Sequence, residues 1–222
     1  MPGRIVTPPL ITETTRNGLV LVDAVNDASV IFKAVPFRMS NAVKGLMLDY
    51  ARLGKPGFYH RYACSVLVGS FKDAPSAEAA CVEAERYLRT HPAPGVKFAQ
   101  PITRARQPAY VFAFTIIPLG HINTHWDDSS RSVINETQPD HQMHDGFVVR
   151  QIAQVEQNLF VSTYGEGDNT DPGRAYLNGT IGTDGFRDLD QRIYRDMRQQ
   201  TGFLNSPLSR PLGTQSAYES DG

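Results

Sequence analysis

The chain has 222 residues, of which 41% are hydrophobic and 20% are charged, so it can bury a core and is not a largely disordered protein. Its 22 Lys and Arg residues against 23 Asp and Glu residues give a net charge of -1. This balance excludes the broad basic surface that drives non-specific DNA binding. No apolar run approaches the roughly 20 residues needed to cross a bilayer.

The first 16 residues are rich in proline and threonine, which predicts an extended arm. Pro8 and Pro9 interrupt the apolar stretch that a general secretion signal requires, so we expect synthesis in the cytoplasm without export by that route. A specialised secretion system does not need such a signal. Cys64 and Cys81 are too few for a disulfide framework and are interpreted as buried thiols. A catalytic Cys64 with His60 on the same strand face is the alternative.

The first half of the chain alternates short strands with helices. Apolar runs predict strands over residues 19–22, 29–32 and 58–68. Helices are predicted from a cap at Ser40 or Asn41 to about residue 53, and from a cap at Ser76 to the break at residues 91–95. Residues 109–117 are the most apolar segment and do not alternate, which is typical of a central strand that is covered on both faces.

The second half contains two predicted loops and a hairpin. Residues 121–146 carry few large apolar groups, which predicts a long functional loop. Residues 147–155 and 158–164 indicate two strands joined by a tight turn at 156–157, and residues 165–185 indicate a second loop. A helix over 186–200 and a coil tail over 203–222 follow. The order predicts one α+β domain over 17–202, with a mixed or mainly antiparallel sheet and about three helices.

Four of the six histidines lie between residues 121 and 144, after the apolar segment: His121, His125, His141 and His144. One interpretation is a divalent metal site. His121 and His125 have the spacing of one helix face, and Asp127 adds an oxygen ligand. The stricter H-E-x-x-H pattern is absent, and no histidine follows residue 144.

A second interpretation is acid and base catalysis without a metal, because histidine titrates near neutral pH. If 156–157 is a two-residue turn, counting back along the hairpin places Arg150 opposite Thr163. A cation beside a hydroxyl would form a clamp for phosphate. In this interpretation His125 and His141 or His144 exchange protons, and no cofactor is needed. The third interpretation is purely structural, with loop histidines that bond to the backbone.

The segment from Asn135 to Gly167 resembles C-terminal domains of bacterial effector and polymorphic-toxin proteins. The resemblance covers about 35 of the 222 residues, and it depends on Asn135, Thr137, His141, His144, Gly146, Val148, Arg150, Thr163, Gly165 and Gly167. It implies a small metal-independent ribonuclease. It also implies that His141 or His144 is the acid/base, Arg150 the phosphate clamp and Thr163 a positioning hydroxyl. A cognate immunity protein is the implied partner.

These observations predict an effector-type enzyme that acts on a phosphate-containing substrate, such as RNA or a nucleotide, through His125, His141, His144, Arg150 and Thr163. The alternative from another class is a non-enzymatic structural or adaptor component of a phage particle or secretion apparatus, which the proline-rich arm and polar tail favour. A third alternative is a metal-dependent enzyme that uses His121, His125 and Asp127.

Overall fold

The computed structural model describes residues 11–12, 19–21, 35–46, 59–113, 117–168, 183–204 and 217–220. The fold is α+β with a mainly antiparallel sheet, as the sequence predicts. The elements are β1 (Ile11–Thr12), β2 (Leu19–Leu21), β3 (Val35–Phe37), β4 (Tyr59–Ser70), α2 (Ala74–Thr90), β5 (Gln107–Ala113), β6 (Ile117–Asp127), β7 (Ser132–Thr137), β8 (Gly146–Val155), β9 (Asn158–Asp168), α4 (Thr183–Met197) and β10 (Ala217–Ser220).

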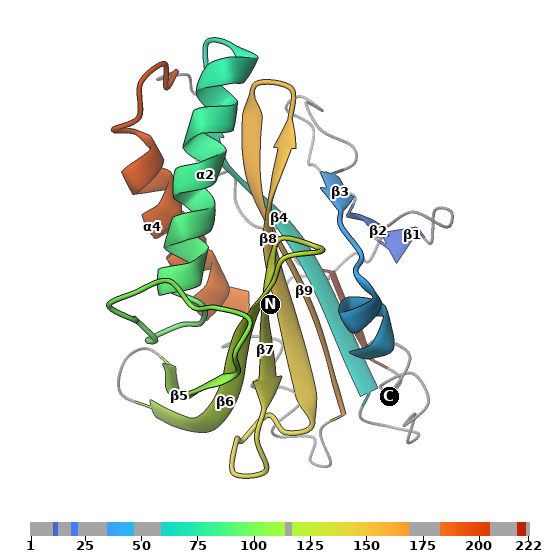
Figure 1. The fold of residues 1–222 in the computed structure, drawn as a ribbon. Helices are drawn as coiled ribbons and strands as arrows, with labels where there is room; N and C mark the ends of the chain where they lie inside the picture. Colours follow the sequence, from blue (N-terminus) through green and yellow to red (C-terminus); the bar gives the residue numbers. More distant parts are fainter. Residues whose placement is uncertain are drawn as a thin grey trace, which may run out of the picture.

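Seven strands form the main sheet, in the order β10-β4-β9-β8-β7-β6-β5. Every pairing between the described strands is antiparallel, and β5 to β9 lie side by side in chain order. A smaller sheet contains β1, β2 and β3. Figure 1 shows α2 and α4 along one face of the main sheet, and β3 with the helical residues 41–46 along the other.

The two faces of the sheet have separate cores because side chains alternate along each strand. On the helix side, Val66, Val161 and Ile152 pack against Leu88 of α2 and Ile193 of α4. On the opposite side, β3 and residues 41–46 cover a second cluster, formed by Phe37, Val43, Ile134, Phe147, Val149 and Tyr164. A side chain therefore changes core when its position shifts by one residue.

The N-cap of helix α2 lies three residues before the predicted cap. The carboxylate of Asp73 accepts the backbone N–H of Ser76 at 2.8 Å, so Asp73 and not Ser76 is the N-cap. The predicted apolar face is confirmed, since Ala77, Cys81, Ala84 and Leu88 are all buried. Burial raises the pKa of the Cys81 thiol to about 11. The helix ends at His91, as expected.

Several other predictions are confirmed. Ser40 accepts the N–H of Val43 at the start of the helical residues 41–46. The hairpin has Val155 opposite Asn158, with Glu156 at a φ of 54° in the turn. The α4 face is also as predicted, because its periodic apolar residues are buried: Phe186, Leu189, Ile193 and Met197.

Three predictions of local structure are wrong. The apolar segment that we expected at the centre of the sheet forms β5, the last strand in the sheet order, where Tyr110 and Phe112 are 40% and 36% exposed. Residues 121–146 are not a long loop, since they contain most of β6 and all of β7. Polar Thr124 and Asn135 occupy buried positions of β6 and β7, which breaks the apolar alternation in the sequence. In the predicted coil tail, Ala217–Ser220 forms β10 against β4.

Some predictions lie outside the described residues. These are the strand at 29–32, residues 1–10 and 13–16 of the arm, residues 47–53 of the first predicted helix, residues 169–182 of the second loop and residues 205–216 of the tail. For Cys64 and His60, only the backbone position in β4 is described. Among the described residues, none of the helices has the length and apolar character of a membrane span.

Gly120 is required where β6 passes the turn at residues 140–141. Its φ is 118°, and a Cβ atom there would lie 2.4 Å from the Cα of His141. We expect Gly120→Ala to lower the free energy of unfolding in urea by more than about 1 kcal/mol. Gly45→Ala is the control, since a Cβ at that helical position meets nothing within 4 Å. It should raise stability by about 0.5–1 kcal/mol, and equal effects of the two substitutions would contradict the close approach at Gly120.

Candidate functional site

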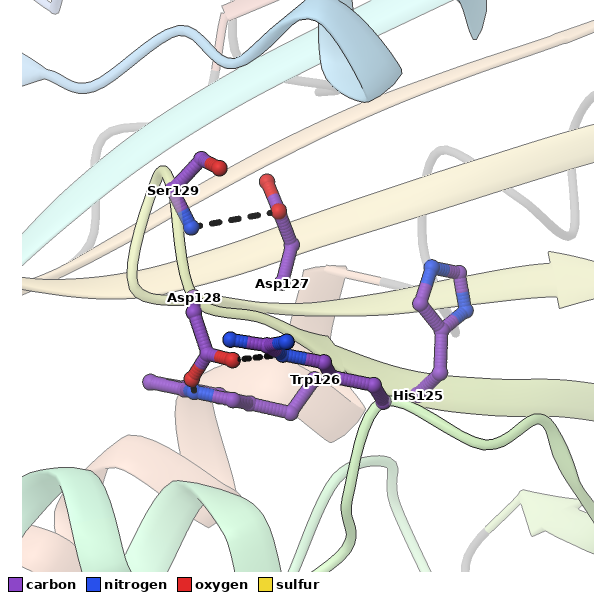
Figure 2. Close-up of a pocket in the computed structure, with 6 residues that line it drawn as sticks. His125, Trp126, Asp127, Asp128 and Ser129 are labelled. Atoms are coloured by element: carbon purple, nitrogen blue, oxygen red, sulfur yellow. Dashed lines mark hydrogen bonds and ion pairs between the residues drawn. The ribbon is translucent and has the colours of Figure 1, made fainter.

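Strand β6 sends its side chains alternately to the two faces of the sheet. Trp126 is buried on the helix side, where the Arg89 guanidinium of α2 lies 5.1 Å from its ring. His121, His125 and Asp127 project to the opposite face and are less buried than their neighbours. Figure 2 shows the His125 ring and the Asp127 carboxylate on one side of the strand and Trp126 on the other.

A pocket of about 390 Å³ lies at the end of β6. Strand β5 starts at Gln107, opposite Thr124, so the last three residues of β6 extend beyond it. The backbone N–H of Trp126 instead donates to the carbonyl of Thr103 at 2.8 Å. This bond holds the segment before β5 against the end of β6. The lining residues come from this segment and from β6 with its following turn: Arg104, His125, Trp126, Asp127, Asp128 and Ser129 (Figure 2).

His125 is the group of the pocket that is best suited to proton transfer. Its side chain is only 16% exposed, and its Nδ1 is buried with no hydrogen-bond partner among the residues that the structure describes. Glu136, on the neighbouring strand β7, places Oε1 3.9 Å from Nδ1. Burial lowers the pKa of His125, and Glu136 only partly opposes this. The ring is therefore neutral at pH 7 and can accept a proton.

Two arginines lie near this end of β6, and each is paired with a carboxylate. Arg106 lies 2.8 Å from Glu136 and Arg104 contacts Asp128, which also accepts the Trp126 indole N–H at 2.7 Å. The Arg104 side chain is 81% exposed. Exposed ion pairs contribute little stability, so an arriving anion can compete with Asp128 for this guanidinium. Four further N–H donors of Arg104 remain besides the Nε that contacts Asp128.

Asp127 is held as a carboxylate at the pocket wall. Its oxygens accept the Ser130 hydroxyl at 2.5 Å and the backbone N–H groups of Ser129 and Ser130 at 3.3 Å. Burial acts to raise the pKa of Asp127, but hydrogen bonds from Ser130 and Ser40 outweigh it and lower the pKa. Asp127 is therefore ionised at neutral pH and is not a proton donor there.

The other predicted histidines lie away from the pocket. His141 is buried, and its Nδ1 accepts the N–H of Met143 at 3.0 Å. His144 places Nδ1 3.2 Å from the Thr137 hydroxyl, and Thr137 pairs with Ile122 near the far end of the β6–β7 ladder. His125 pairs with Ile134, three residues along the same ladder, so the His125 pair and the Thr137 pair are roughly 10 Å apart. The structure does not bring His141 or His144 to His125.

Arg150 lies opposite Thr163, as predicted, but on the wrong face for an anion clamp. The register runs Trp126, Val133, Arg150 and Thr163 across four strands, so both residues share the helix side with Trp126. Arg150 and Thr163 are fully buried. Arg150 bonds to Asp190 of α4 and to the carbonyl of His91, which leaves no open side for a substrate.

Asp190 was not identified from the sequence as the ion-pair partner of Arg150. Asp190 lies four residues after Phe186 and three before Ile193, within the apolar stripe of α4, and it is fully buried. An acidic residue in such a stripe requires a buried cation. This spacing was the available signal for the Arg150–Asp190 pair.

The expected metal ligands are spread along a strand and not around a helix turn. In a β-strand, a separation of four residues spans about 13 Å, so His121 and His125 cannot share one ion. His121 is instead 2.5 Å from Asp140. No group of three or more His, Cys, Asp or Glu side chains with a metal-binding arrangement occurs in the described part of the chain.

His141 should make stability depend on pH. Burial lowers the pKa of His141 to about 4 from 6.5. A depressed folded-state pKa means that the unfolded chain binds the proton first, so stability is fully present above pH 6.5 and is lost as pH falls towards 4. The loss is roughly 3 kcal/mol. We expect His141→Asn, whose amide oxygen can still accept the Met143 N–H, to remove this pH dependence in urea unfolding. An unchanged pH dependence in the variant would contradict this assignment.

No protein-family model and no curated protein matches the sequence. Among solved structures, a solution NMR structure from Thermobifida fusca, target TfR85A, has 20% identity and a TM-score of 0.37. The NMR structure of KanY protein (ms6282) has 10% identity and a TM-score of 0.39. Each match covers 62% of this chain and 93% of the other chain.

Proposed function

We propose that the pocket at His125 is the active site of an enzyme that cleaves or transfers a phosphate-containing group by histidine acid/base chemistry. The observation that carries this proposal is the buried Nδ1 of His125, which has no hydrogen-bond partner among the described residues and lies 3.9 Å from Glu136, with an exposed arginine at the same pocket. A histidine near a carboxylate and a cation is suited to proton transfer at a phosphodiester.

Each group has a definite role in this proposal. The Nε2 of His125 takes the proton of the attacking hydroxyl or water, and the resulting imidazolium is stabilised by Glu136 on the side of Nδ1. Arg104 binds the phosphate oxygens and offsets the charge that develops on them. His125 then returns the proton to the leaving oxygen or to water. No metal takes part in these steps, and Arg104 replaces Arg150 as the phosphate-binding cation.

The resemblance to effector and toxin domains extends the proposal to a metal-independent ribonuclease that is toxic to a host cell. The test is expression from a tightly controlled promoter in bacteria, with growth and RNA integrity followed after induction. The wild-type chain should arrest growth and degrade RNA, and His125→Gln should do neither at equal protein level. His144→Gln is the matched control and should remain toxic. Unimpaired growth with intact RNA would overturn the toxic-ribonuclease proposal and favour the structural or adaptor role.

A further inference from the structure

An exposed row of rings lies on the same face of the sheet as His125. Tyr110 and Phe112 of β5 have ring centroids 5.0 Å apart, and the His121 ring meets Tyr110 edge-on at 4.7 Å. Tyr110 pairs directly with His121 across the β5–β6 ladder. We call Tyr110, Phe112 and His121 the aromatic row. Exposed apolar residues that lie together in one patch, in contrast to single ones, mark an interaction site.

The aromatic row and the pocket lie along the same strand. His121 and His125 lie on one face of β6, about 13 Å apart along the strand. Arg106 comes just before β5 and pairs with Glu136, which lies opposite Asn123 between the row and His125. A chain that passes over the row can therefore reach His125 with its next few units, and it passes Arg106 on the way. In Figure 1, β5 lies at one end of the sheet, beside β6.

The two arginines near the row are each paired with a carboxylate, Arg104 with Asp128 and Arg106 with Glu136. The His121 ring is hydrogen-bonded to Asp140. Paired arginines attract a polyanion only weakly at long range, so ring stacking must supply much of the binding free energy. Base–aromatic stacking tolerates every base, and arginines beside the rings contact phosphates.

We infer that the aromatic row is a stacking platform for bases of single-stranded nucleic acid, which directs a neighbouring phosphodiester into the His125 pocket. The inference rests on the proposed function, because it names the substrate class of the same site. One base stacks on Tyr110 and one on Phe112, while Arg106 and Arg104 exchange their carboxylate partners for phosphate oxygens. Since each arginine starts out paired, we expect binding to weaken only slightly with salt, in contrast to a basic groove.

The test measures binding by fluorescence anisotropy, in the His125→Gln background so that no strand is cut. The probes are labelled hexauridylate, the matching thymidine DNA hexamer, and an abasic hexamer with the same phosphates. Tyr110→Ala and Phe112→Ala should each weaken hexauridylate binding about tenfold. The abasic strand should bind as weakly to the parent as hexauridylate binds to these variants. Val82→Ala, at an exposed apolar position of α2, is the control and should change nothing.

Equal affinity for the abasic strand, or full affinity in Tyr110→Ala and Phe112→Ala, would overturn the platform. So would self-association of the parent that Tyr110→Ala abolishes, because the row would then be a protein interface. RNA bound tenfold more tightly than DNA would identify RNA as the substrate, and equal affinities would identify single strands in general. Both results agree with the platform.

A second assay separates the platform from the chemistry. The substrate is 2-hydroxypropyl p-nitrophenyl phosphate, which has an RNA-like phosphodiester and no base. Cleavage of this ester by the wild-type chain, without base-dependent binding, would retain the catalytic proposal and overturn the platform. Base-dependent binding with no cleavage of either substrate would retain the platform and overturn the catalytic proposal.

Discussion

Replacing Arg150 with methionine is expected to lower the free energy of unfolding by roughly 3–5 kcal/mol, because it leaves the carboxylate of Asp190 buried without its cation. Both side chains are 0% exposed, and they join α4 to the middle of the sheet. Asp190→Leu should lower the free energy of unfolding by a similar amount, since it leaves the Arg150 guanidinium buried without its carboxylate. Urea unfolding followed by circular dichroism measures both losses.

The double substitution Arg150→Met with Asp190→Leu separates a core role from a clamp role. Because both charges are removed together, stability should return to within about 1–2 kcal/mol of the wild type. Activity at His125 should return with it, since Arg150 faces the helix side and His125 the opposite side. A double variant that is stable but inactive would contradict our assignment and restore Arg150 as a substrate-binding residue.

His125→Gln is expected to lower kcat/KM for an RNA substrate by about 100- to 10,000-fold, because the amide cannot accept a proton. Folding should be unaffected, since the His125 ring makes no hydrogen bond through its buried Nδ1 to any described residue. The matched control is His144→Gln, which changes a histidine about 10 Å further along the ladder. This variant should retain the wild-type kcat/KM. The wild-type enzyme should also keep its kcat/KM when the assay contains EDTA.

The pH profile adds a signature that a structural role for His125 would not give. Because burial lowers the pKa of His125 from its ordinary value of 6.5, the acid limb of kcat/KM should lie below pH 6.5. Glu136→Gln removes the charge that favours the imidazolium, so it should lower kcat/KM about tenfold and move the acid limb to still lower pH. An acid limb at or above pH 6.5, or one that does not respond to Glu136→Gln, would assign the base elsewhere.

The sequence predicted most of the elements whose apolar spacing is strong. The faces of α2 and α4 and the hairpin of β8 and β9 follow from apolar residues that recur at regular spacing. The Arg150–Thr163 register was also predictable, because a two-residue turn determines every pair behind it. Strands β6 and β7 were missed because Thr124 and Asn135 occupy positions in their buried faces, which hides the alternation.

The candidate site was predictable in part. The histidine cluster located the correct segment, and His125 lies in the pocket. The sequence did not show on which face of the sheet each side chain lies. In the structure, His125 and Arg150 lie on opposite faces, and His141 is buried. Glu136, Arg104 and Arg106 were missed because their relation to His125 depends on β7 pairing with β6 and on the path of residues 103–106.

Phosphate-containing ligands should bind at His125 if this histidine is the base of the site. Histidine-selective nitrogen-15 NMR can follow such binding, because the chain has only six histidines and each gives its own ring signals. We would titrate the protein first with inorganic phosphate and then with uridine 3′-monophosphate. We expect the His125 signals to move in a saturable way, Arg104→Gln to weaken this response, and the signals of His141 and His144 to stay in place. A saturable response at His91 or His144, with His125 unmoved, would place the ligand elsewhere and exclude His125 as the phosphate site.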